Sequence, residues 1–250
     1  MKLTLLCTIF IFQLQGLCAQ SAFWEQQQSY PKVAKAIKAR TDTLQQQFKK
    51  EGLVFPPKQL YIRSFKYDSQ LEVWVKSKGD TNFQLFKTYP VCALSGTMGP
   101  KRMDGDFQVP EGCYFIKSFN PLSNYHLSLA LNYPNASDRL LSDSIKPGSD
   151  IFIHGGCLTQ GCIPIKDVPM EELYVLAAYA QLQGQDFIPV HIFPINYNQE
   201  KSQAFLKKSS RDDPEYRAFT EKMKLIFTFF QERHQLPIIG VNQKGEYQIF

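Results

Sequence analysis

Short apolar runs separated by turn residues fill the stretch from Gln59 to Ile116 and its immediate continuation. The runs read LYIRSFKY, LEVWVKS, FQLFKTYPVCALS and CYFIKSF, with Gly, Asp and Asn between them. Each run is rich in β-branched and aromatic residues and has about the length of a strand. The pattern predicts an antiparallel meander, so we expect a β-sheet to be the scaffold of the fold.

The N-terminal part of the chain has the pattern of an amphipathic helix. Helix formers dominate from Trp24 to Glu51, and four apolar residues recur there at helical spacing. These are Val33, Ile37, Leu44 and Phe48. We expect one helix that lies on the main domain and is ended by Phe55-Pro56-Pro57, because proline does not continue a helix.

Strand and helix patterns alternate in the second half of the chain. Asp150 to His154 and Phe187 to Ile195 are short apolar segments that predict strands. Met170 to Gln183 and Glu215 to His234 are rich in helix formers and predict helices. After Pro237, two short strands are expected around a turn at residues 242–245.

The first residues resemble a secretory signal peptide. Met1-Lys2 precedes the apolar run Leu3 to Phe12, and a more polar stretch leads to Ala19. The run is too short to span a bilayer, which needs about 20 apolar residues. We expect residues 1–19 to be cleaved, with a retained anchor as the weaker alternative. The mature chain would then work outside the cytoplasm with a net charge of +4 and four cysteines, because Lys2, Cys7 and Cys18 are removed.

Composition narrows the class of protein. The chain has 250 residues, 44% of them hydrophobic, which is enough to bury a core. The net charge of +5 is spread along the chain, which argues against a nucleic-acid partner. No later stretch is long and apolar enough to predict membrane insertion. Six cysteines are too few for a disulfide scaffold, so each needs its own explanation.

Candidate catalytic residues gather in the segment IFIHGGCLTQGCIPI, Ile151 to Ile165. His154 ends a predicted strand, and Cys162 follows eight residues later across a glycine-rich loop. A thiol nucleophile needs a base within reach, because the thiolate is the reactive form. Gly161 allows unusual backbone dihedrals beside Cys162, so that N–H groups can converge on an oxyanion.

Two alternatives explain the same residues without catalysis. His154, Cys157 and Cys162 supply three zinc ligands, and a fourth would have to come from elsewhere in the chain. Cys92, Cys113 and His191 are the candidates for that position. A structural disulfide that uses Cys157 or Cys162 is the second alternative, since an oxidising compartment permits it. Spacing alone does not decide between these interpretations.

Several motifs together resemble the YkuD-type L,D-transpeptidases, in particular the YafK-like branch. The first is His154-Gly155 followed by Thr159-Gln160-Gly161-Cys162, with the compressed His-Gly-Gly-Cys loop typical of that branch. The runs FKTYPVCALSGTMGPKRMDGDFQVPEGCYFI and NYHLSLALNYPNASD are similar to further family segments, as is the tail after Leu236-Pro237. The resemblance covers about Leu53 to Phe250.

The resemblance implies a mainly β fold, with a β-sandwich catalytic domain and flanking N- and C-terminal helices. We expect a helical segment over residues 20–57, the catalytic domain over 58–196, and a C-terminal helix with short strands over 197–250. Cys162 would be the nucleophile, His154 the general base and acid, and Gly155 would orient the imidazole through its backbone carbonyl. The N–H groups of Gly161 and Cys162 would form the oxyanion hole.

Substrate-binding residues are further candidates. His126, in a Tyr-His-Leu-Ser segment, is a candidate to line the substrate groove beside Thr159 and Gln160, with a structural or surface role as its alternative. Gln160 and Pro164 depart from the family, which commonly has basic residues at these positions. Cys157 is expected to be either a pocket residue or half of a disulfide with Cys92 or Cys113.

The function implied by the resemblance is acyl transfer on peptidoglycan stem peptides through a thioester, with no cofactor and no metal. The location would be the periplasm of a Gram-negative-type bacterium, or outside the cell. Water as acceptor gives hydrolysis, including release of wall-linked protein or peptide from diaminopimelate, and an amine gives transpeptidation. A non-catalytic wall-binding module with the same fold is the alternative from another class, and a zinc-stabilised secreted domain is a third.

Overall fold

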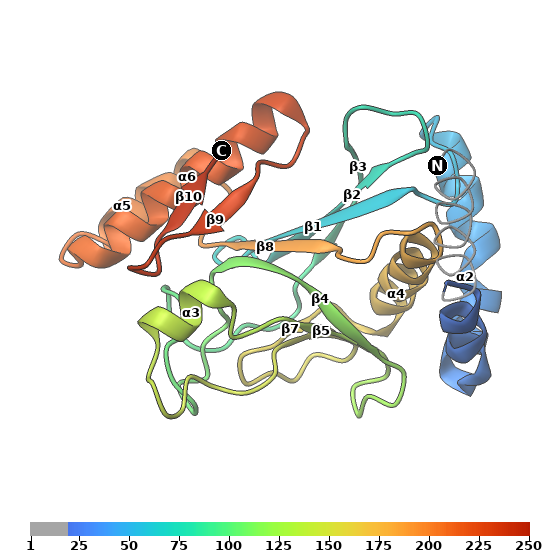
Figure 1. Cartoon of the computed structure of the whole chain (residues 1–250), viewed down its shortest axis with the longest axis horizontal. Helices are drawn as coiled ribbons and strands as arrows, with labels where there is room; N and C mark the ends of the chain where they lie inside the picture. The colour runs from blue at the N-terminus through green and yellow to red at the C-terminus, as the bar shows by residue number, and fades with distance from the viewer. Residues whose placement is uncertain (1–19) are drawn as a thin grey trace, which may run out of the picture.

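A computed structural model describes residues 20–250 as a mixed eight-stranded sheet with helices on both faces (Figure 1). The predicted signal peptide, residues 1–19, lies outside the described residues. The sheet order is β3-β2-β1-β8-β4-β5-β6-β7, and a separate hairpin pairs β9 with β10. The strands are β1 (Gln59–Phe65), β2 (Gln70–Lys76), β3 (Gln84–Pro90), β4 (Gly112–Asn120), β5 (Ser128–Leu131), β6 (Phe152–His154), β7 (Ile163–Pro164), β8 (Pro189–Phe193), β9 (Ile239–Val241) and β10 (Tyr247–Ile249). The helices are α2 (Pro31–Lys50), α3 (Ala136–Leu141), α4 (Asp167–Leu182), α5 (Glu200–Ser209) and α6 (Pro214–Arg233).

The predicted meander is correct for its first three strands and wrong for the fourth. β1, β2 and β3 pair in antiparallel order. β4 does not continue them, because β8 pairs parallel to β1 and stands between β1 and β4. This insertion brings a strand from late in the chain into the middle of the sheet, which local sequence patterns do not encode.

The N-terminal helical region is interrupted, where a single helix was expected. Residues 20–29 are helical, and α2 begins at Pro31 after Tyr30. Proline is tolerated in the first turn of a helix, where its missing N–H costs no internal hydrogen bond. α2 ends at Lys50, before the Phe55-Pro56-Pro57 segment, and the chain turns at Gly52 with a positive φ of 70°.

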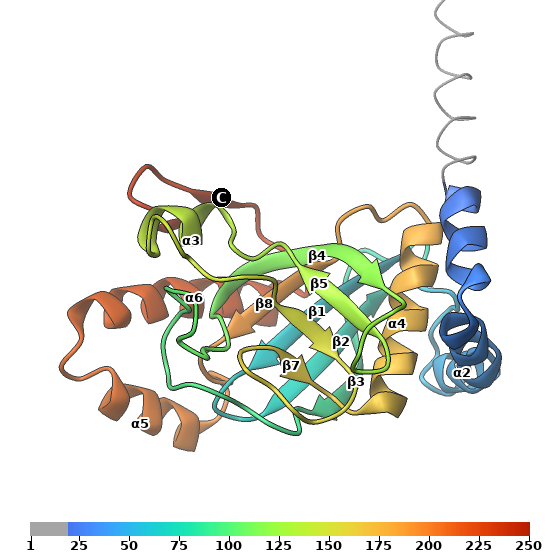
Figure 2. The ribbon, with the colours of Figure 1, turned by 90° about the horizontal axis from the view of Figure 1, so that it is seen from below.

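Helix α4 lies against the sheet and is covered by α2. It contacts β1, β5 and β6 on one side and α2 on the other. Its residues from Met170 to Ala178 are buried on every side, as expected for a helix without a solvent face. Figure 2 shows the sheet curled, with α2 and α4 at one end of the molecule and α5 and α6 at the other.

The opposite face of the sheet packs on α6. Side chains of β1 alternate, so that Leu60 and Ile62 join the α4 side while Tyr61 and Phe65 contact the α6 side. Arg63 is buried between aromatic rings on this side, and its guanidinium lies 2.6 Å from the Glu72 carboxylate. The pairing satisfies a charge that would otherwise be costly to bury.

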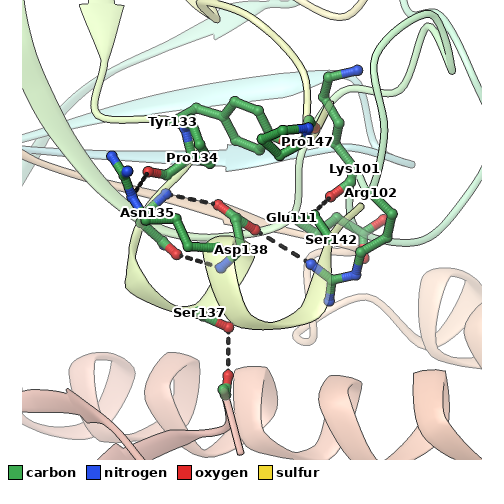
Figure 3. A network of polar contacts seen from close by, with 12 residues as sticks. Lys101, Arg102, Glu111, Tyr133, Pro134, Asn135, Ser137, Asp138, Ser142 and Pro147 are labelled. Carbon is green, nitrogen blue, oxygen red and sulfur yellow. Dashed lines mark hydrogen bonds and ion pairs between the residues drawn. The ribbon is translucent and has the colours of Figure 1, made fainter. Parts of the chain in front are cut away.

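Helix α3 joins the loop before β4 to the C-terminal hairpin through a polar network (Figure 3). Asn135 and Asp138 form a capping box at its start, and Arg102 donates to the Asp138 carboxylate at 3.4 Å. The Ser137 hydroxyl donates to the Gly245 carbonyl in the β9–β10 turn. Burial raises the pKa of Asp138 to about 6. The network fixes the loop before β4 and the C-terminal hairpin to the same short helix.

The fold prediction is confirmed in its coarse form. The centre of the molecule is rich in β-strands and has helices before and after it, as expected. More of the described residues lie in helices than in strands, so "mainly β" applies to the centre only. The strands of residues 59–193 follow one continuous sheet order, so the finer expectation of a β-sandwich is not confirmed. None of the helices within residues 20–250 is both long and apolar enough to cross a membrane.

Candidate active site

The pairing of β6 with β7 brings His154 and Cys162 to the same region of the sheet. The two strands are parallel, with Ile153 opposite Ile163 and His154 opposite Pro164. Ile153 and Ile163 are fully buried in the core, so the side chains before and after them point to the other face. His154 therefore points to the other face, and Cys162 directly precedes β7, with its Sγ next to the Phe152 N–H at the start of the strand that His154 ends.

The imidazole of His154 is oriented by the backbone of the next residue. Its Nδ1 lies 2.5 Å from the Gly155 carbonyl oxygen, which can only accept a hydrogen bond. Nδ1 is therefore the protonated nitrogen, and Nε2 is left with a free lone pair. Only 2% of the residue is exposed, and this burial lowers the pKa of His154. The ring is neutral at neutral pH and can accept a proton.

Cys162 is a partly buried thiol. Its Sγ accepts a hydrogen bond from the Phe152 N–H at 3.4 Å. Burial raises the pKa of the Cys162 thiol, while that hydrogen bond and the positive charge of Lys101 act in the opposite direction. Burial therefore favours a neutral thiol beside a neutral imidazole in the resting protein, and not a preformed thiolate–imidazolium pair.

Two glycines let the chain return from His154 to Cys162. Gly156 and Gly161 have φ values of +65° and +118°, which other residues rarely adopt. A Cβ on Gly161 would lie 2.9 Å from the Gln108 carbonyl oxygen, so a larger residue would displace that segment. The Thr159 hydroxyl donates to the Cys162 carbonyl at 2.7 Å and closes the turn.

A disulfide between Cys92 and Cys157 fixes this loop to the segment after β3, with a Cα–Cα distance of 5.6 Å. It decides between the partners that the sequence left open for Cys157, since Cys113 remains a free thiol. Cys162 is also free, so the disulfide alternative applies to Cys157 and not to the candidate nucleophile. Burial raises the pKa of Cys113, which favours the neutral thiol form.

Two of the cysteines expected as zinc ligands, Cys157 and Cys92, are joined in the disulfide. Cys157 is oxidised in the disulfide and cannot coordinate a metal as a thiolate. Among residues 20–250, no three His, Cys, Asp or Glu side chains are grouped closely enough to hold a metal ion. His191 is buried in β8, where its Nδ1 pairs with the Tyr61 hydroxyl at 2.8 Å.

The loop between β4 and β5 covers the candidate base. The ring of Tyr125 lies over the His154 ring, with centroids 4.7 Å apart and a tilt of 34°. A Cβ on Gly155 would lie 2.8 Å from the Tyr125 carbonyl and 3.0 Å from the Cβ of His126. The close approach of this loop therefore requires glycine at position 155. Tyr125 was not singled out from the sequence, because nothing local in the sequence marks its contact with His154.

The contacts of His126 fit the structural alternative that the sequence left open. Its Nε2 lies 2.8 Å from one oxygen of Glu171, and Arg40 donates to the other oxygen at 2.7 Å. The Nζ of Lys32 donates to the backbone carbonyls of Ser123 and His126. The His126 imidazole is thus held between α4 and α2, and the described contacts give it a bracing role for the Tyr125 loop.

The other two substrate-binding candidates, Thr159 and Gln160, differ in their contacts and exposure. Thr159 uses its hydroxyl within the loop, whereas Gln160 is exposed at the loop tip. Pro164 is buried in β7 opposite His154. Of Thr159 and Gln160, only Gln160 presents a side chain to solvent that is free to meet a ligand, because no hydrogen bond to another described residue engages it.

Lys101 is a charged neighbour of the site that sequence reasoning did not assign. It is 95% buried, forms an ion pair with Asp106 and donates to the Met103 carbonyl at 2.8 Å. Its charge lowers the pKa of Cys162, as noted above, while Asp150 acts in the opposite direction. The Gly-Pro-Lys run that contains Lys101 belongs to the family resemblance. This run is the sequence signal that could have identified the residue.

Comparison with known proteins supports the resemblance found in the motifs. No family model matches the chain. The chain is 29% identical over 192 residues to the Escherichia coli K12 protein named "Putative L,D-transpeptidase YafK", which covers 76% of this chain and 73% of the relative. The Escherichia coli O157:H7 protein of the same name matches equally.

Two solved structures have a lower similarity. The helical cell shape determining protein Pgp2 from Campylobacter jejuni is 21% identical with a TM-score of 0.42, over 74% of this chain and 73% of that one. Bd1075 from Bdellovibrio bacteriovorus is 23% identical with a TM-score of 0.40, over 70% and 63%. At these TM-scores, neither likeness supports a statement about the function of this chain. The motifs around His154 and Cys162 and the sequence match together identify the chain as a relative of YafK.

Proposed function

We propose that the chain is a cysteine acyl-transfer enzyme that acts on peptidoglycan stem peptides. The observation that supports this proposal is the parallel register of β6 and β7, which brings Cys162 next to the strand that ends in His154, where Nδ1 of the imidazole is engaged and Nε2 is left to accept a proton. The relationship to a protein named as an L,D-transpeptidase supports the substrate class.

In the first step, the Cys162 sulfur attacks the carbonyl carbon at the L-centre of diaminopimelate, while His154 Nε2 takes the thiol proton. The carbonyl π electrons move to oxygen, and the N–H groups of Gly161 and Cys162 are our candidates to stabilise the oxyanion. Collapse of this intermediate breaks the C–N bond. The leaving amine takes the proton from His154, and a thioester remains on Cys162.

In the second step, an acceptor attacks the thioester carbonyl and His154 again takes its proton. The proton then passes to the Cys162 sulfur as the C–S bond breaks. Water as acceptor releases a shortened stem or a wall-linked peptide, and an amine forms a new cross-link. A neutral resting pair suits this cycle, because deprotonation then accompanies attack on a bound substrate.

The proposed setting is the periplasm, reached after cleavage of residues 1–19. Peptidoglycan is the proposed partner, and the mechanism uses neither metal nor cofactor. The domain assignment follows from this proposal: residues 58–196 carry the catalytic machinery, residues 20–57 brace it, and residues 197–250 pack on the opposite face of the sheet.

Incubation with defined muropeptides tests the proposal. The wild-type protein is expected to shorten a donor stem or, with an acceptor present, to form a dimer, as measured by product mass. Cys162→Ala and His154→Ala should reduce product formation by about a thousandfold or more, since they remove the nucleophile or its base. Cys113→Ala is the matched control and should retain activity, because its thiol lies on β4, outside the His154–Cys162 segment. Unchanged product formation by Cys162→Ala would refute the assignment, and the absence of product from the wild-type protein would favour a wall-binding module.

The pH profile tests the neutral resting pair. The His154 pKa is lowered, so kcat/KM should rise with pH through a midpoint below the ordinary imidazole value of about 6.5. The Cys162 pKa is raised, so the decline at high pH should lie above the ordinary thiol value of about 8.5. A broad plateau through neutral pH is expected. Thiolate absorbance near pH 7 in the resting protein, or an acid limb centred above pH 7, would contradict this state of the pair.

The bracing contacts of α2 give a third test. Lys32→Ala removes two hydrogen bonds that fix the Tyr125 loop over His154, so we expect kcat to fall by about tenfold while the fold is retained. Lys38→Ala is the control, since Lys38 is exposed on the same helix. Equal activity of the two variants would mean that α2 does not position the site.

A further inference from the structure

Residues of α5 and α6 line a hollow of about 640 Å³. These two helices lie at the end of the molecule opposite α2 and α4 (Figures 1 and 2). Five basic side chains line it, with Glu221 as the one acidic residue among the lining. They are Lys207, Lys208, Arg211, Arg217 and Lys224. Cations from both helices therefore converge on one concave surface.

These five cations have no ion-pair partner among the described residues. Buried cations elsewhere in the protein, such as Arg63 and Lys101, are each paired with a carboxylate. One of the five, Arg217, donates a hydrogen bond to the Arg211 carbonyl at 2.9 Å. This bond holds the guanidinium at the rim of the hollow. The charges of these five side chains are thus not offset by ion pairs with carboxylates among residues 20–250.

The helix dipole explains only part of this arrangement. Lys207 and Lys208 lie in the last turn of α5, where a cation is favourable. Arg217 lies near the start of α6, where the dipole disfavours a cation, and Lys224 lies in the middle of that helix. The convergence of Arg217 and Lys224 on the lysines of α5 needs another reason.

The floor of the hollow is less polar than its rim. Leu206 and Tyr197 are more than 90% buried there, and the Tyr197 hydroxyl already donates to the Thr220 carbonyl. The floor therefore offers mainly apolar surface, while the rim offers cationic donors. A ligand that fits both has a compact body and at least two negative groups.

We propose that this hollow binds a small oligoanion whose negative groups are carboxylates or phosphates. Arginine recognises both groups with two parallel hydrogen bonds, and the lysines add point charges. The proposal goes beyond the proposed acyl transfer and does not depend on it, since none of the residues lining the hollow belongs to the His154–Cys162 site.

Calorimetric titration of the chain without residues 1–19 tests the proposal. Citrate and pyrophosphate are the carboxylate and phosphate probes, and soluble muropeptides with free carboxylates are the wall-derived probe. We expect saturable binding of citrate or pyrophosphate with a 1:1 stoichiometry, weakened by added salt as for charged recognition at a surface.

Two double variants distinguish binding in the hollow from binding to general surface charge. Lys207→Glu with Lys224→Glu reverses two lining charges, and we expect it to weaken binding by about tenfold or more. Lys201→Glu with Lys222→Glu makes the same charge change on the same helices outside the lining, and it should bind nearly as the wild type does. If the first variant does not fold, Lys207→Gln with Lys224→Gln replaces it.

Two results would overturn the proposal. One is an equal loss of affinity in both double variants, which would assign binding to net charge. The other is the absence of saturable binding for all three probes. Muropeptide turnover by the same samples is measured separately, so that loss of catalysis and loss of anion binding are distinguished. If citrate alone or pyrophosphate alone binds, that result identifies the anionic group.

Discussion

The short return between β6 and β7 is the constraint on which the candidate site depends. Parallel neighbours usually need a connection of a dozen residues or more, and here Gly155–Cys162 makes the return in eight. Such a connection closes only with left-handed backbone at Gly156 and Gly161. The disulfide at Cys157 then fixes the outer part of the loop to the segment after β3. The candidate nucleophile is thereby held at a defined place relative to the candidate base.

Elements distant in sequence hold the other side of the site. Tyr125 lies over His154, and the loop that carries it is fixed by Lys32 and by the contacts among His126, Glu171 and Arg40. Because α2 and α4 supply these groups, the N-terminal helix contributes to the geometry of the site. Rigid support of this kind matters for acyl transfer, since small displacements of reacting groups are costly in rate.

Local patterns in the sequence predicted the elements that local physics determines. The strands β1 to β3 and the helices α4 and α6 follow their apolar periodicity, and Asp213 caps α6 where Asp-Pro indicated its start. The helices α3 and α5 were missed, because the first has only six residues and the second is mostly polar and exposed. The position of β8 between β1 and β4 was also missed, since strand order depends on contacts between distant segments.

The candidate site was predicted to a similar extent. The motif marked His154 and Cys162 as candidates, and their catalytic roles stay predictions. The contact between the Gly155 carbonyl and the imidazole is the one that the family resemblance implied. The partner of Cys157 could not be chosen from spacing, because both Cys92 and Cys113 were open to it. The sequence left His126 between a groove position and a structural role, and it could not predict the pairing with Glu171, which arises from the packing of α4 against the β4–β5 loop.

The most direct test of the central claim is the intact mass of the protein after treatment with a carbapenem, whose ring carbonyl acylates an accessible thiol paired with a base. We predict a single adduct with the full mass of the compound on the wild-type protein and on Cys113→Ala, and no adduct on Cys162→Ala. An adduct that persists in Cys162→Ala, or no adduct on the wild-type protein, would contradict the assignment of Cys162 as the nucleophile.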